Sequence, residues 1–238
     1  MCQTPGMSAA GVRARVRAEL TREITDAARR QLASDGAAAL SLRAVARELG
    51  MASSAVYRYF PSRDDLLTTL IVDAYDALGA AAERAEAAVE REDLRARWRA
   101  GCRAVRGWAL AHPHEYALVY GSPVPGYAAP ASTVAPAGRV GELLCRILAD
   151  GIAAGAVDPA ADPGDADSTL VPGVAERVGL PADSDSSIAG RAVQAWSGLF
   201  GLVNFELFGH THNVVADHAR FFDDAVDRLG TQLGLPHS

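Results

Sequence analysis

The 238-residue sequence predicts an all-α protein. Apolar residues recur at spacings of three and four along most of the chain, which is the period of a helix with one buried face. Hydrophobic residues make up 49% of the chain and aromatic residues only 6%, while alanine is abundant. That balance supplies a core and favours closely packed helices over sheets. Glycine and proline interrupt the helical patterns at positions where helices are expected to end.

The first helix is predicted by an apolar stripe that closes at Gly36 and contains Val16, Leu20, Ile24, Ala27, Ala28 and Leu32. Residues 1–11 are rich in small residues and are expected to be disordered.

A second helix is predicted over residues 42–49, whose apolar positions are Leu42, Val45, Ala46 and Leu49. Ser41 stands at its N-cap, where its hydroxyl can accept a backbone N–H. Gly50 follows at the position where a helix often ends on a left-handed residue. Two short helices around such a turn are typical of a helix-turn-helix.

The third helix is expected to begin near Ala52 or Ser53, to run to Tyr59 and to end at Pro61. Val56 and Phe60 lie four residues apart and can anchor it on the second helix. Its other side then carries Ser53, Ser54, Ala55, Tyr57, Arg58 and Tyr59. Small residues let the backbone approach base edges, whereas the tyrosines and the arginine can donate to phosphates. The pattern therefore indicates DNA binding.

A fourth helix is predicted after a capping box formed by Ser62 and Asp65, and its apolar positions extend toward Ala82. This helix would link the DNA-binding unit to the rest of the chain.

The charge distribution supports this interpretation, although the net charge is −6. All 23 basic residues are arginine; residues 1–63 hold ten of them against five acidic residues, which gives +5 and leaves −11 for the remainder. A basic N-terminal unit on an acidic body is expected of a protein that binds DNA with one end. Arg13, Arg15 and Arg17 are either a phosphate-binding arm or a solvated helix face.

Residues 50–66, and above all the run from Ala55 to Arg63, resemble the signature of the TetR (tetracycline repressor) family of bacterial transcription regulators. The resemblance covers about residues 16–72. It implies a homodimer in which a three-helix DNA-binding domain precedes a helical ligand-binding and dimerisation domain. We accordingly expect domains at residues 12–62 and 63–235.

The resemblance also implies roles for single residues. Ser53, Ser54 and Ala55 stand at base-reading positions, and Tyr57 and Tyr59 at phosphate-contacting positions. Arg63 matches a phosphate contact at the start of the fourth helix, and Ser41 and Arg43 match positions that touch backbone or bases. Ala52 departs from the family pattern, because many relatives have a serine or threonine cap there.

Helices are further predicted over residues 83–111, 114–121, 140–154 and 172–178, with loops at 122–138 and around the last of them. Residues 108–127 resemble a C-terminal subtype of the family marked by a Trp, a His and a Gly (WHG). Aromatic residues that could line an effector pocket, or could simply belong to the core, are Trp98, Trp108, Tyr116, Tyr120 and Phe205.

The last fifty residues predict two antiparallel helices joined by a turn at residues 210–213. Their bulky stripes favour a four-helix bundle with a second copy of the chain, although they could instead pack only on their own body. The predicted dimer interface comprises Val193, Trp196, Phe200, Val203, Leu207, Phe222, Val226 and Leu229.

Several classes of site lack a sequence signal. A metal site is not expected at His210, His212 and His218, because no carboxylate stands at metal-ligand spacing from them. The sequence also has no phosphate-binding loop and no catalytic nucleophile motif. We therefore expect no metal, no cofactor and no enzymatic activity. Cys102 and Cys145 read as small buried residues, with redox sensing as the alternative. The chain shows no signal peptide and no apolar run long enough to span a membrane, and is expected in the cytoplasm.

The predicted function is therefore that of a ligand-responsive transcriptional regulator, most simply a repressor. It would bind a near-palindromic operator in double-stranded DNA as a homodimer and would be released by a small-molecule effector. A ligand-independent DNA-binding or interaction protein, and a helical enzyme, are the alternatives.

Overall fold

The computed structural model describes residues 9–157, 170–171, 173–177, 180 and 186–236, and the described part is helical with no strand. The α-helices are α1 (Ala9–Asp35), α2 (Leu42–Glu48), α3 (Ser53–Tyr57), α4 (Arg63–Ala87), α5 (Leu94–Ala111), α6 (Pro113–Tyr120), α7 (Val134–Ala153), α8 (Val174–Arg177), α9 (Ser186–Leu207) and α10 (His218–Gln232). Two 3₁₀ turns, η1 (Ala37–Ala39) and η2 (Ala131–Thr133), precede α2 and α7. The all-α prediction is confirmed.

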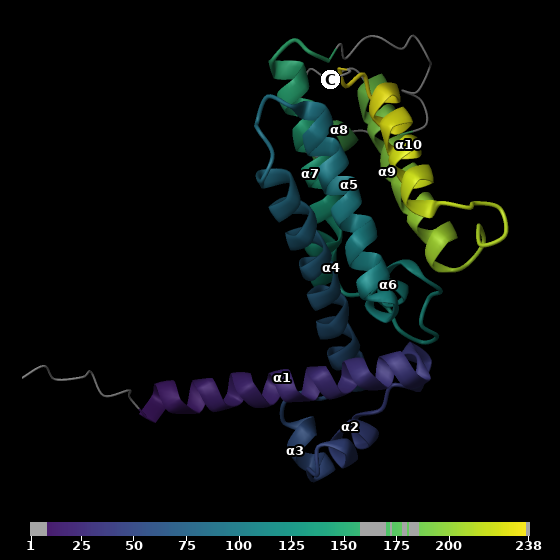
Figure 1. Cartoon of the computed structure of the whole chain (residues 1–238). Coiled ribbons are helices and arrows are strands. Elements are labelled where there is room, and N and C mark those ends of the chain that lie inside the picture. The colour runs from purple at the N-terminus through teal and green to yellow at the C-terminus, as the bar shows by residue number, and fades with distance from the viewer. Residues whose placement is uncertain (1–8, 158–169, 172, 178–179, 181–185, 237–238) are drawn as a thin grey trace, which may run out of the picture.

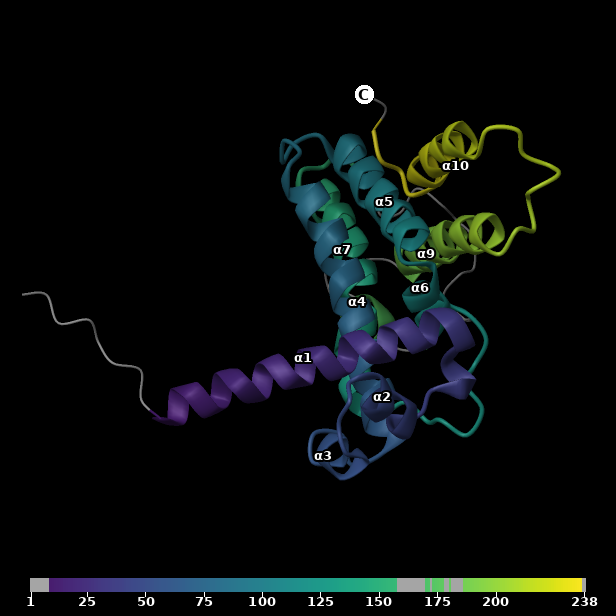
Figure 2. The same ribbon diagram turned by 60° about the horizontal axis from the view of Figure 1, so that its bottom comes forward.

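The helices form two units that share α4. Helix α1 lies across one end of α4, with α2 and α3 beyond it, and the remaining helices form an elongated body along the rest of α4 (Figures 1 and 2). The smaller core contains Ile24 and Ala28 of α1 and Val56 of α3, together with the first two turns of α4. The larger core begins at Ala74 and extends to α10. The two cores therefore divide within α4, after Ile71.

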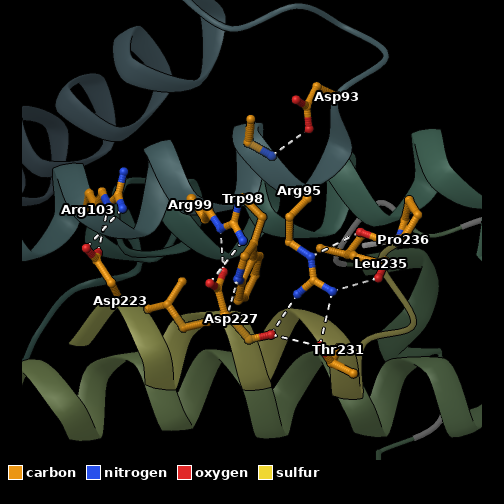
Figure 3. A network of polar contacts seen from close by, with 12 residues as sticks. Asp93, Arg95, Trp98, Arg99, Arg103, Asp223, Asp227, Thr231, Leu235 and Pro236 are labelled. Atoms are coloured by element: carbon orange, nitrogen blue, oxygen red, sulfur yellow. Dashed lines mark hydrogen bonds and ion pairs between the residues drawn. The ribbon is translucent and has the colours of Figure 1, made fainter. Parts of the chain in front are cut away.

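Helix α10 is tied to α5 by a row of arginines (Figure 3). The buried Arg95 donates to the carbonyl oxygen of Asp227 at 2.6 Å and to that of Leu235 at 2.9 Å. Farther along α5, Arg99 and Arg103 pair with Asp227 and Asp223. The hydrogen bond from Arg99 lowers the pKa of the Asp227 carboxyl. A buried guanidinium is tolerated here because carbonyl oxygens replace its water.

Arg97, two residues after Arg95, ties the same end of α5 to α4 and α7. Its side chain is fully buried and contacts Glu86 of α4 at 2.6 Å and Asp150 of α7 at 2.7 Å. Both acids lie in the larger unit, so this arginine fixes α4, α5 and α7 to one another.

Several predicted boundaries were wrong. Helix α1 begins at Ala9, so residues 9–11 are helical rather than disordered. The helix expected over residues 83–111 is interrupted before Asp93, whose carboxylate accepts the Ala96 N–H and starts α5. Helix α7 begins at Val134, six residues earlier than expected, with Pro136 in its first turn, where the missing N–H costs no hydrogen bond. Most of the loop expected around the helix predicted over residues 172–178, from residue 156 to residue 185, lies outside the described residues.

Candidate nucleic-acid interface and ligand cavity

The helix-turn-helix is held together by a small apolar contact behind α3. Val56 is fully buried and Phe60 is 5% exposed, and both belong to the smaller core. Gly50 adopts φ 64° between α2 and α3, a left-handed conformation that favours glycine. The anchors and the turn are as predicted, although α3 ends at Tyr57 rather than Tyr59. A five-residue helix is not stable alone, so its orientation depends on these contacts.

The predicted DNA-contacting residues of α2 and α3 lie at the surface to different degrees. Arg43, Ser54, Tyr57 and Arg58 are exposed. Ser41, Ser53, Ala55 and Tyr59 are half-buried. Ala52 is the N-cap residue of α3 and contributes no side-chain cap, and α3 starts at Ser53. The arrangement leaves small and hydroxyl side chains at the N-terminal end of α3 and a tyrosine and an arginine at its C-terminal end.

Ser41 does not cap α2 in the predicted manner. It occupies the N-cap position, but its hydroxyl makes no capping hydrogen bond. Instead its backbone N–H donates to the Oε1 atom of Gln31 at 2.9 Å, which ties the start of α2 to α1. The cap of α4 follows the prediction, since the Ser62 hydroxyl accepts the Asp65 N–H at 3.1 Å.

Arg63, at a position where the sequence predicts a phosphate contact, is half-buried and hydrogen-bonded within the chain. Its guanidinium donates to the carbonyl oxygens of Leu40 at 3.1 Å, Ala37 at 2.9 Å and Ala38 at 3.2 Å. These carbonyls belong to the segment between α1 and α2. The sequence signal for such a role is slight, because nothing in the motif distinguishes an arginine that binds phosphate from one that binds carbonyls.

A cavity of about 610 Å³ opens between α7 and α9, beside Trp98 of α5. Its lining is mostly apolar and includes Gly138, Gly141, Leu144, Cys145, Leu148, Ala189, Ala192, Val193 and Trp196, with Glu142 as its one charged side chain among the described residues. Trp98 donates its indole N–H to the Val226 carbonyl at 2.9 Å, so it presents only ring surface to the cavity.

The five predicted pocket residues do not line one pocket, and of them only Trp98 lines this cavity. Trp108 and Tyr116 are buried in the larger core. Tyr120 stacks on Phe200 with ring centroids 4.2 Å apart, and with Phe205 it borders a different hollow of about 850 Å³ near the end of α1. Aromatic composition cannot show which of these side chains fill the core and which border a cavity.

Half of the residues predicted for the dimer interface are buried within the chain itself. Phe200, Val203, Phe222 and Val226 are buried in the chain's own core, because the main apolar stripes of α9 and α10 face α5 and α7. Val193 and Trp196 line the cavity between α7 and α9. Leu207 and Leu229 are half-buried.

The outward side of α9 and α10 carries a second apolar surface, and the predicted interface residues Phe222 and Leu229 line it. A groove of about 420 Å³ runs between the two helices and is lined by residues that include Gly198, Gly201, Leu202, Phe205, Phe221, Ala225 and Leu229. Phe205 is 57% exposed and Phe221 is 44% exposed. Large aromatic rings exposed side by side with glycine and alanine are typical of a surface that is covered by a partner.

Two comparisons by sequence profile identify the chain's family. Residues 24–70 match the profile described as bacterial regulatory proteins, tetR family, and residues 98–229 match the tetracyclin repressor-like C-terminal domain. The second match covers more than half of the chain. The chain belongs to the TetR family. It is a helix-turn-helix transcriptional regulator.

Curated relatives are similar in sequence over nearly the whole chain. The HTH-type transcriptional regulators Rv1816 of Mycobacterium tuberculosis and Mb1846 of Mycobacterium bovis are each 40% identical over 229 residues, covering 94% of both chains. A solved structure of a regulatory protein named SCO4313 is similar with a TM-score of 0.75 and 34% identity, over 91% of this chain and 97% of that one. A TetR-family regulator of Thermus thermophilus, PfmR, shares the fold at a TM-score of 0.53 and 20% identity, over 90% and 99% of the two chains.

Membrane spans, metal sites and reactive thiols were also sought among the described residues. No helix there is long and apolar enough to cross a membrane, and no group of three potential metal ligands gathers. Burial raises the pKa of the Cys102 thiol, and burial together with Glu142 raises that of Cys145 to about 11. Both thiols are therefore protonated at neutral pH and poor nucleophiles, which argues against redox sensing.

Arg63→Ala should destabilise the protein even when no DNA is present. The change removes charge-assisted hydrogen bonds to three carbonyls, two of them in part-buried contacts. We expect a loss of about 1–3 kcal/mol of unfolding free energy, measured by urea titration. Arg58→Ala is the matched control, because Arg58 is exposed and its loss should leave stability unchanged. Equal stability of the two variants would show that Arg63 has no structural role.

Proposed function

We propose that the chain is a ligand-responsive repressor that binds a near-palindromic operator as a homodimer and is released by a small apolar effector. The observation that carries this proposal is the helix-turn-helix itself. Val56 and Phe60 hold the back of α3 in the core, while Ser54, Tyr57 and Arg58 stay at the surface. Such a helix can enter a major groove without any rearrangement of the core. Action on the chromosome would place the protein in the cytoplasm.

The contacts with DNA divide by side-chain chemistry. Ser53, Ser54 and Ala55 are short enough for the start of α3 to approach base edges. Tyr57, Arg58 and Arg43 have donors that suit phosphate oxygens, which fix the protein on the duplex without reading sequence. Arg63 supports this surface indirectly by holding the segment before α2.

Dimerisation would use the outward groove between α9 and α10. Phe205 and Phe221 are too exposed to contribute to the core of one chain, and the glycines and Ala225 leave room for a ring from another copy. A twofold pairing of these helices gives a four-helix bundle, and it presents two α3 helices to half-sites about 34 Å apart.

The effector would bind in the cavity between α7 and α9. Its size suits a small molecule, and its lining suits an apolar or aromatic one. Arg139 of α7, between the two glycines that line this cavity, binds α4: it contacts Asp76 at 2.7 Å and Glu83 at 2.6 Å. A Cβ atom on Gly79 would lie 2.9 Å from Arg139, so the two helices touch closely at this point. A ligand that displaces α7 would therefore displace α4, and with it the DNA-binding unit.

The WHG subtype is part of this proposal, and two contacts and one steric limit support it. Trp108 stacks on His112 with ring centroids 4.8 Å apart, and the His112 Nδ1 atom lies 3.0 Å from the Trp108 carbonyl oxygen. A Cβ atom on Gly121 would lie 2.3 Å from the carbonyl oxygen of Ala117, so only glycine fits there. The three residues thus shape the ends of α5 and α6.

Selection from a random duplex library tests the DNA-binding role. The wild type should enrich a twofold-symmetric motif, and Ser54→Ala should change the preferred bases. Tyr57→Phe should weaken binding to all sequences alike, by roughly tenfold at most, because a phosphate contact carries no base information. Absence of any enriched motif would contradict the proposal.

Phe221→Asp should produce a monomer at micromolar concentration in sedimentation equilibrium, because a carboxylate would be buried in the apolar interface. Val214→Asp is the control, since Val214 is 79% exposed and does not line the groove. A monomeric wild type, or a dimeric Phe221→Asp variant, would overturn this interface.

Gly141→Leu should fill the cavity and weaken binding of a neutral fluorescent probe, N-phenyl-1-naphthylamine, by tenfold or more, on the order of the 1.4 kcal/mol that corresponds to one decade. The added side chain would point toward Trp196, since a Cβ atom there lies 3.9 Å from its ring. Gly107→Leu makes the same substitution at a position with nothing within 4 Å and should leave probe affinity unchanged. Equal probe binding by all three proteins would exclude this cavity as the site.

A further inference from the structure

Helix α1 is much longer than its packing requires. It has 27 residues, yet its first buried side chains are Ile24 and Thr25. All nine residues from 11 to 19 are exposed. Figures 1 and 2 both show this half of α1 continuing past α2 and α3. At 1.5 Å per residue, the stretch from residue 11 to residue 22 projects about 17 Å.

Packing within the chain does not explain this projection. Most helical stability in proteins comes from burying one face, and a helix that is exposed on every side is marginal in water. The projecting half carries Arg13, Arg15, Arg17 and Arg22 against Glu19 and Glu23. A partner with negative charge would supply the missing stabilisation.

The helical register gives the arginines two different directions. Positions 13, 17, 20, 24 and 28 follow one another by three or four residues and share a face. On that face Ile24 and Ala28 are fully buried against the DNA-binding unit, and Leu20 is half-buried. The inward stripe of α1 therefore continues beyond the unit as Arg17 and Arg13, with the exposed Val16 beside them. Arg15 and Arg22 lie seven residues apart on the opposite face.

One contact places the inward stripe beside the DNA-reading elements. The Arg17 guanidinium lies 5.2 Å from the centre of the Tyr59 ring. Tyr59 follows α3 by two residues, and the family resemblance places it at a phosphate-contacting position. The inward face of the projecting half of α1 thus begins beside the C-terminal end of α3 and extends away from it.

We propose that the N-terminal half of α1 is a second DNA-contacting element, in which Arg13 and Arg17 bind phosphates outside the stretch that α3 covers. This inference rests on the proposed binding of DNA by α3. The partner is the sugar-phosphate backbone of DNA. The projecting face offers guanidinium groups at helical spacing, and guanidinium groups bind phosphates. Each subunit would cover a longer segment of duplex than its helix-turn-helix alone.

The test compares Arg13→Ala/Arg17→Ala with Arg15→Ala/Arg22→Ala in the full chain. Both double variants remove the same charge from the same helix, and alanine preserves helix formation. Affinity for one selected duplex is measured between 50 and 200 mM salt. The inward pair should lower the slope of log affinity against log salt by about 3–4, since four phosphate contacts are lost per dimer at ~0.9 each. The outward pair should leave the slope within error of the wild type.

Hydroxyl-radical footprinting of the DNA provides the second readout. The inward variant should lose protection at both outer edges of the footprint and keep it at the centre of each half-site. Arg13→Lys/Arg17→Lys should restore most of the slope, because the charge is kept. Equal slopes for the two alanine variants, or an unshortened footprint, would overturn the proposal. A wild type that binds no duplex in a salt-dependent manner would instead refute the proposed function.

Discussion

The structure depends on one helix that belongs to two cores. Leu66, Leu67 and Leu70 of α4 pack with α1, α2 and α3, while Ala74 and Leu78 of the same helix pack with the body. Because no loop interrupts α4 between these contacts, the DNA-binding unit cannot turn freely on the body. Any displacement of α4 along its length is passed directly to α3.

Because α4 is continuous, two arginine contacts on it can affect both units. Arg63 at the start of α4 holds the segment before α2, and Arg139 of α7 binds the middle of α4 beside Gly79. The first contact connects α4 to the segment before α2, and the second connects it to α7, which lines the cavity proposed for an effector. Both contacts involve the same helix, which is how a shift of α7 would reach the segment before α2 under the proposed mechanism.

The sequence predicted local features such as turns and helix anchors. It did not predict which apolar face of a helix packs against the chain's own core. Gly50, Val56 and Phe60 were assigned correctly, because a left-handed turn and an i, i+4 anchor are properties of a few consecutive residues. The stripes of α9 and α10 were found, yet Phe200 and Phe222 point inward whereas Phe205 and Phe221 point outward. Periodicity defines a stripe but not the body it faces, and a helix with two apolar faces leaves the choice open. The hydrogen bonds of Arg63 and the cavity beside Trp98 depend on contacts between distant segments, which a local sequence pattern cannot predict.

Hydrogen exchange along α4 tests the central claim most directly. If α4 is one rigid element shared by both cores, the amides of residues 66–82 should exchange slowly and with a common free energy of opening, in the free protein and with DNA bound. A break in protection between Ile71 and Ala74, with the N-terminal turns opening independently of the body, would contradict the account.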